Sequence, residues 1–115
     1  MNNSVGIDIV EFARIEKMIS ERFINRILSD EEKVIYDNFK SDKRRIEFLA
    51  GRFAAKEAYT KLYKRFDTPL NFTDVKVLHD EFGAPYIKST YKSEDNISVS
   101  ISHSENYAVA ICIKL

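Results

Sequence analysis

The chain has 115 residues, of which 44% are hydrophobic and 31% are charged, a composition typical of one globular domain and unlike that of a disordered chain. Its 18 basic and 18 acidic side chains balance, so no overall field recruits nucleic acid or an anionic membrane. The single cysteine, Cys112, excludes an internal disulfide and lies in an apolar run typical of a buried thiol. Because no signal sequence or membrane-spanning segment precedes the first predicted strand, the expected location is the cytoplasm.

Residues 5–10, VGIDIV, predict a strand that carries a carboxylate near its centre. Alternation with a period of two places Val5, Ile7 and Ile9 on one face and Asp8 on the other. Aspartate is depleted in strands, and a carboxylate away from water needs a cation, hydrogen-bond donors or solvent. Asp8 is therefore either an exposed or edge-strand residue or part of a site.

Residues 12–28 have apolar side chains at roughly helical spacing and predict one amphipathic helix. The side chains outside the apolar stripe form a basic face: Arg14, Lys17, Met18, Glu21, Arg22, Asn25 and Arg26. From the pattern alone this is an ordinary solvated face. Ser29 and Glu32 then match a capping box, which predicts a second, short helix that ends near Phe39.

Ser41 or Asp42 can cap a longer helix from about residue 43 to 65. Its inner stripe consists of Ile46, Leu49, Ala50 and Phe53. Glu57 occupies the place where the next core residue belongs. Lys61 lies one turn further on and either pairs with Glu57 or reaches a phosphate; the spacing favours neither.

The rest of the chain predicts strands at 72–78, 85–90, 97–103 and 107–113, with a turn at 80–83. The strand at 107–113 is apolar on both faces, so we expect helices to cover one face and a second subunit the other. His103 ends an apolar strand face, where it is either an ordinary histidine at the core edge or a functional group. His79 lies in a turn-like stretch and is expected to be a surface bystander.

Asp8 and Glu57 both stand where apolar residues are expected, and together they suggest a site. Magnesium takes one or two carboxylates and completes its coordination with water and substrate phosphate, so a Mg²⁺ site is one interpretation of the pair. The sequence has no Walker glycine loop, no Cys/His zinc spacing and no nucleophile elbow.

Three segments, GIDIVE at 6–11, FLAGRFAAKEA at 48–58 and SISHS at 100–104, resemble in order and spacing the signatures of one family. This family is the holo-acyl-carrier-protein synthases, the small 4′-phosphopantetheinyl transferases of fatty-acid synthesis. The resemblance covers essentially the whole chain. It implies an α+β fold in a single domain, residues 1–115, with a small antiparallel sheet packed against a long helix, assembled as a homotrimer with active sites at subunit interfaces.

The resemblance also implies an activity: Mg²⁺-dependent transfer of the 4′-phosphopantetheine arm of coenzyme A to a serine of apo acyl-carrier protein, releasing adenosine 3′,5′-bisphosphate. On the matching positions, Asp8 and Glu57 would hold the metal, and Glu57 would help to remove the serine proton. Lys61 would neutralise the pyrophosphate and the leaving group. Arg44, Arg52 and His103 would contact the phosphates of coenzyme A.

In this family the basic first helix would meet the acidic carrier protein. The implied docking residues are Arg14, Met18, Arg22, Phe23 and Arg26. The chain departs from the family pattern at 63–69, which lacks the usual glycines, and at Ala84, where a lysine is usual. Two alternatives to this enzyme are a non-catalytic adaptor of the same fold, and a magnesium-dependent enzyme that acts on another pyrophosphate.

Overall fold

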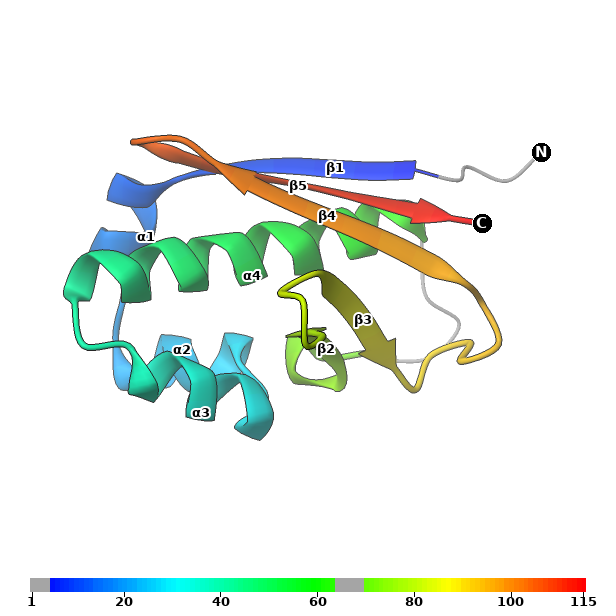
Figure 1. Cartoon of the computed structure of the whole chain (residues 1–115), viewed down its shortest axis with the longest axis horizontal. Coiled ribbons are helices and arrows are strands. Elements are labelled where there is room, and N and C mark those ends of the chain that lie inside the picture. The colour runs from blue at the N-terminus through cyan, green and yellow to red at the C-terminus, as the bar shows by residue number, and fades with distance from the viewer. Residues whose placement is uncertain (1–4, 64–69) are drawn as a thin grey trace.

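The computed structural model describes residues 5–63 and 70–115. Its central element is the helix α4 (Asp42–Leu62), which runs along one face of a three-stranded antiparallel sheet of order β1-β5-β4 (Figure 1). The three strands are β1 (Val5–Glu11), β4 (Ile97–His103) and β5 (Tyr107–Lys114). This arrangement confirms the predicted α+β class and the packing of a small antiparallel sheet against a long helix. None of the described helices is long and apolar enough to cross a membrane.

The smaller elements lie mainly on the other side of α4 (Figure 1). They are the helices α1 (Phe12–Met18), α2 (Glu21–Ile27) and α3 (Asp30–Asn38), and a hairpin of β2 (Val75–His79) and β3 (Pro85–Ser89). The predicted caps are confirmed: Ser29 and Glu32 form the capping box of α3, and the Ser41 side chain accepts a hydrogen bond at the start of α4.

Three predicted boundaries are wrong or lie outside the described chain. The single helix predicted at 12–28 is divided into α1 and α2, because Ser20 is extended and its hydroxyl accepts a hydrogen bond from the Phe23 amide at 3.1 Å, which starts a new helix. The strand predicted from residue 72 begins at Val75, because residues 72–74 form a 3-10 turn closed by Asn71 and Asp74. The long helix ends at Leu62, and residues 64 and 65 of its predicted range are not described.

The sheet and α4 approach each other closely through small residues. On the sheet the facing residues include Gly6, Ala108, Ala110 and Cys112, and on α4 they include Ala54, Ala55 and Ala58; all are buried. A Cβ atom on Gly6 would lie 2.0 Å from the carbonyl oxygen of Ala58 and 2.8 Å from the amide nitrogen of Leu62. The predicted burial of the Cys112 thiol is confirmed, and burial raises its pKa to about 12.

On the opposite face of the sheet, β1 and β5 are apolar and β4 carries exposed serines, and no part of the chain that the structure describes covers the apolar strands. The exposed large side chains of this face are Val5, Ile7 and Ile9 on β1 and Tyr107 and Ile113 on β5. Between the two β5 residues, Val109 and Ile111 are half-buried. The prediction that helices leave one face of the last strand uncovered is therefore confirmed.

The variant Gly6→Ala tests this close approach. The added methyl group meets backbone atoms, which cannot rotate away, so we expect the free energy of unfolding in urea to fall by roughly 3 kcal/mol. Gly51→Ala is the matched control, because its added Cβ would lie 3.3 Å from a side-chain methyl of Ile101 and the helix gains propensity. We expect the control to change stability by less than about 1 kcal/mol. Equal effects at the two glycines would contradict this account of the packing.

Candidate functional site

Asp8, Glu57 and Lys61 form a cluster between β1 and α4. The side chain of Asp8 lies on the helix-facing side of β1 and is 16% exposed. The ammonium group of Lys61 is 3.1 Å from Oδ1 of Asp8 and also donates to the carbonyl oxygen of Ile7 at 3.0 Å. Glu57 precedes Lys61 by one helical turn. The partner of Lys61 in the structure is thus Asp8, an arrangement that the sequence-based choice between Glu57 and a phosphate did not include.

The charge of Asp8 acts on the carboxylate of Glu57. Burial raises the pKa of Glu57, and the negative charge of Asp8 raises it further, whereas Lys61 and Arg14 lower it. Among the described residues no third histidine, cysteine or acidic side chain joins the two carboxylates as a possible metal ligand. Two partly exposed carboxylates are a donor set that fits Mg²⁺, which completes its coordination with water and phosphate oxygens, whereas a structural zinc site needs four protein ligands.

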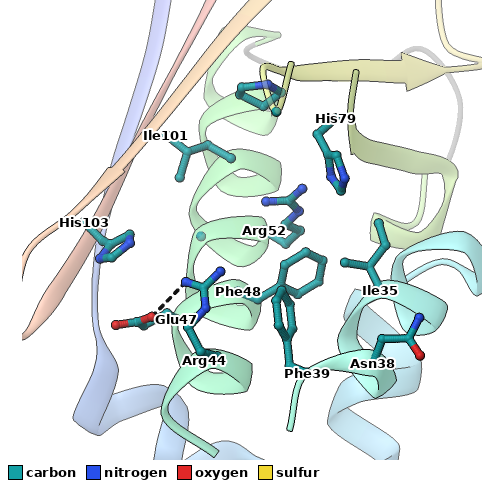
Figure 2. A pocket seen from close by; sticks show the side chains of 13 residues that line it. Ile35, Asn38, Phe39, Arg44, Glu47, Phe48, Arg52, His79, Ile101 and His103 are labelled. Atoms are coloured by element: carbon teal, nitrogen blue, oxygen red, sulfur yellow. Dashed lines mark hydrogen bonds and ion pairs between the residues drawn. The ribbon is translucent and has the colours of Figure 1, made fainter. Parts of the chain in front are cut away.

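A second group of predicted residues lines a pocket of about 620 Å³. Arg44 and Arg52 reach into it from α4 and His103 borders it from β4, so the structure brings these three predicted residues together (Figure 2). The rest of the wall comes from α3, α4, β4 and the β2–β3 hairpin: Ile35, Asn38, Phe39, Glu47, Phe48, Gly51, His79, Gly83, Pro85 and Ile101.

Each pocket arginine is held against an aromatic ring. The guanidinium carbon of Arg44 lies 4.9 Å from the ring centre of Phe39, and that of Arg52 lies 4.2 Å from the ring centre of Phe48. Arg44 also forms a 3.0 Å ion pair with Glu47. Burial lowers the pKa of Arg52 to about 10, which leaves it a cation at neutral pH. The two guanidinium groups provide cations that can bind phosphates, and the aromatic rings beneath them provide flat apolar surface that can stack against a nucleotide base.

The sequence reasoning missed several members of this pocket. His79, expected to be a bystander, faces the arginines from the end of β2 (Figure 2). Its position beside the Gly83–Pro85 turn depends on the hairpin pairing, which places His79 opposite Pro85. Phe48 had a local signal, because it precedes Arg52 by one helical turn.

The carboxylate cluster and the pocket lie on different sides of α4. At about 100° per residue, Glu57 lies about 140° around the helix axis from Arg52, and Lys61 about 180°. The sheet order agrees: Asp8 is on the β1 edge, whereas His103 is on the β4 edge, with β5 between them. One chain therefore does not bring its own carboxylates and its own pocket to one place.

The residues predicted for partner docking divide into exposed and buried members. Arg14, Met18, Arg22 and Arg26 are exposed on α1 and α2, and the last two border a shallow groove with Glu21 and Asn25. Phe23 is 7% exposed and packs against Phe53 with ring centres 6.0 Å apart. Phe23 therefore lies beneath that face and supports it, and a direct part of Phe23 in docking stays a prediction.

The chain has relatives over nearly its full length. A family model described as the 4′-phosphopantetheinyl transferase superfamily matches residues 4–112. A holo-[acyl-carrier-protein] synthase of Geobacillus sp. (strain WCH70) is 49% identical over 109 residues, which are 92% of this chain and 90% of the relative. A holo-[acyl-carrier-protein] synthase of Acholeplasma laidlawii (strain PG-8A) is 38% identical over 113 residues, which are 98% of this chain and 96% of the relative.

Solved structures of holo-[acyl-carrier-protein] synthases are also similar to this chain over nearly its full length. The crystal structure of a holo-(acyl-carrier-protein) synthase from Bacillus anthracis str. Ames in complex with CoA (3′,5′-ADP) has a TM-score of 0.86 and 40% identity, over 96% of this chain and 94% of that one. The Helicobacter pylori holo-[acyl-carrier-protein] synthase in complex with coenzyme A has a TM-score of 0.81 and 32% identity, over 96% of this chain and 99% of that one.

Proposed function

The chain belongs to the 4′-phosphopantetheinyl transferase superfamily, and from this premise we infer that it transfers the 4′-phosphopantetheine arm of coenzyme A to a serine of apo acyl-carrier protein. The products are holo acyl-carrier protein and adenosine 3′,5′-bisphosphate. The observation that carries the inference is the cluster of Asp8 on β1 with Glu57 and Lys61 on α4. These residues come from two separate sequence motifs, and the cluster is partly exposed.

In the proposed mechanism Asp8 and Glu57 hold Mg²⁺, a role supported by two neighbouring carboxylates without a third protein ligand among the described residues. When bound, Mg²⁺ would offset the charge that develops on the phosphoryl group during transfer. Lys61 neutralises the pyrophosphate, moving its ammonium group from Asp8 to a phosphate oxygen. The serine oxygen attacks the phosphorus next to the pantetheine arm, its proton passes to Glu57, and the bond to the bisphosphate leaving group breaks.

We propose that each active site is shared by two copies of the chain. The pocket with Arg44, Arg52 and His103 binds the coenzyme A phosphates of a substrate whose reacting end lies at the carboxylates of the next copy. Opposite flanks of α4 support this division. A contact between two different edges repeats around an axis and forms a ring when the rotation closes, and the homotrimer implied by the resemblance is such a ring. The uncovered apolar face of β1 and β5 would be buried in that ring.

Three exposed arginines and one exposed methionine of α1 and α2 are the proposed docking surface for the acyl-carrier protein: Arg14, Met18, Arg22 and Arg26. The charge of Arg14 lowers the pKa of Glu57, so this surface borders the carboxylates that would receive the serine. A cytoplasmic location remains a prediction. The adaptor alternative would use the docking surface without the carboxylate cluster, and a transfer assay separates the two functions.

The transfer assay uses the protein with coenzyme A, Mg²⁺ and apo acyl-carrier protein, followed by mass spectrometry of the carrier. We expect a gain of one phosphopantetheine arm that is abolished by chelation of the metal. Asp8→Ala and Glu57→Ala each remove a carboxylate, so each should lower the rate by roughly 100-fold or more. Glu94→Ala, which removes an exposed carboxylate in the turn before β4, is the control and should retain full activity. Binding of the carrier without any mass gain would favour the adaptor.

The shared site predicts complementation between two inactive variants. Glu57→Ala keeps the pocket, and the double variant Arg44→Ala/Arg52→Ala keeps the carboxylates. When the two chains are refolded together at equal amounts, about one quarter of the sites in a mixed ring combine an intact pocket with intact carboxylates. Transfer activity should rise to about that fraction of the wild-type rate. Activity no higher than the sum of the separate variants would show that each chain uses its own residues.

The docking surface predicts selective effects of charge reversal. Arg14→Glu and Arg22→Glu each add repulsion to an acidic partner, so the KM for the carrier should rise while the affinity for coenzyme A stays unchanged. Higher salt should weaken the wild-type interaction. Lys88→Glu, an equal charge change on exposed β3, is the control. A loss of coenzyme A affinity in the α1 and α2 variants would place these arginines at the coenzyme pocket instead.

A further inference from the structure

Glu32 and Lys56 form a buried ion pair that the proposed reaction does not use. Both side chains are 0% exposed, and Nζ of Lys56 is 2.7 Å from Oε1 of Glu32. Lys56 also donates to the carbonyl oxygens of Ile27 at 2.5 Å and Phe72 at 2.9 Å. Its three N–H groups thus have partners in three different segments. A buried ion pair adds little net stability compared with apolar side chains of similar volume, so stability alone does not account for this pair.

The carboxylate of Glu32 does more than cap α3. Oε1 accepts a hydrogen bond from the Ser29 amide at 2.8 Å, which completes the capping box, and another from Nζ of Lys56. Oε2 accepts the amide N–H of Val77 at 2.8 Å. Val77 lies in β2, whose only strand partner among the described residues is β3, so its N–H and carbonyl groups on the open edge need other partners.

The carbonyl oxygen of the same Val77 accepts Nε of Arg52 at 3.2 Å. With Nε engaged and the guanidinium group resting on Phe48, the two Nη atoms are presented to the pocket, as Figure 2 shows. Within the part of the chain that the structure describes, these Nη atoms have no hydrogen-bond partner. Glu32, Val77 and Arg52 therefore form a continuous chain of hydrogen bonds from the core to the pocket.

The charges of Glu32, Arg52 and Lys56 also link the core to the pocket. Arg52 and Lys56 are two cations one helical turn apart on α4. Burial lowers the pKa of each, and the positive charge of Arg52 lowers that of Lys56 further, whereas the negative charge of Glu32 raises both. Glu32 thus offsets the repulsion between a lysine that is fully enclosed and an arginine that faces the pocket.

We propose that Glu32 and Lys56 are positioning residues for substrate binding: through the Val77 backbone they hold the Arg52 guanidinium in the orientation that binds a phosphate of coenzyme A. This inference rests on the proposed function, because it takes the pocket as the coenzyme A site. Neither residue touches the substrate. Their contribution belongs to the affinity for coenzyme A, not to the chemical step.

The test measures binding of adenosine 3′,5′-bisphosphate by calorimetry, without metal or carrier protein. The double variant Glu32→Gln/Lys56→Met keeps the net charge and the approximate volume. The Ser29 and Val77 amides are bound by different oxygens of Glu32, and glutamine replaces one of these oxygens by an NH2 group, which cannot accept a hydrogen bond. We expect the Kd to rise about tenfold and kcat at saturating coenzyme A to remain within about twofold of the wild type. Ile15→Ala, a fully buried change on α1, is the control for lowered stability and should leave the Kd unchanged.

A double-mutant cycle separates positioning from a general structural effect. In an Arg52→Ala background the Glu32/Lys56 change should have no further effect on the Kd, because the group that it positions is gone. In the wild type the Nε–H resonance of Arg52 should be protected from exchange with solvent, and this protection should be lost in the Glu32/Lys56 variant before any ligand is added. If that variant does not fold, Glu32→Asp takes its place, because aspartate keeps the charge but withdraws the carboxylate from Val77. The same loss of exchange protection and of affinity is expected.

Two results would overturn the positioning role alone: an unchanged Kd in the folded variant, or a loss that simply adds to that of Arg52→Ala. An Arg52→Ala variant that binds the bisphosphate as tightly as the wild type would overturn more. It would remove Arg52 from the coenzyme A site, and thereby both the pocket assignment in the proposed function and this inference.

Discussion

The contact between β1 and α4 determines where the two carboxylates lie. Gly6 sits directly against the backbone of Ala58 and Leu62. Asp8 is the next residue of β1 that faces the helix, and Glu57 and Lys61 each precede one of those two contact residues on α4. The approach of two backbones therefore places an aspartate, a glutamate and a lysine within reach of one another. A larger side chain at Gly6 would separate the strand from the helix and with it the three charged groups.

Within the six residues from Arg52 to Glu57, α4 places side chains in three different environments. Arg52 faces the pocket, Lys56 is enclosed with Glu32 in the core, and Glu57 faces Asp8 on the other flank. The rotation of an α-helix is sufficient to direct neighbouring residues into different environments. The helix thus acts both as the core of the fold and as a wall between a phosphate-binding side and a carboxylate side. This separation is the structural reason for proposing a site made by two copies.

The sequence predicted those features that depend on local spacing. The period of β1 separated Asp8 from the face with Val5, Ile7 and Ile9, but it did not indicate that the Asp8 face packs against the helix while the apolar face stays exposed. The period of α4 identified Glu57 as a carboxylate in place of a core residue. Contacts between distant elements could not be predicted in this way. His79 joins the pocket only because the hairpin folds back beside α4, and Glu32 reaches Val77 across 45 residues. Phe23 was included among the docking residues through the resemblance, although its spacing of four residues from Ile19 and from Ile27 is that of a buried stripe.

The strand order also affects how the chain folds. β5 is the last strand in chain order but occupies the centre of its sheet, between β1 at the beginning of the chain and β4. Neither ladder of that sheet can form until residues 107–114 are available, whereas α4 needs only local contacts. Closing β1 onto β5 joins residues about a hundred positions apart, which raises the contact order and slows folding. During synthesis the part of the small-residue face of α4 that β5 covers must therefore stay open until the final segment arrives, although β1 can already pack against α4. A chain that stops before β5 keeps the helix and the β2–β3 hairpin but lacks the three-stranded sheet.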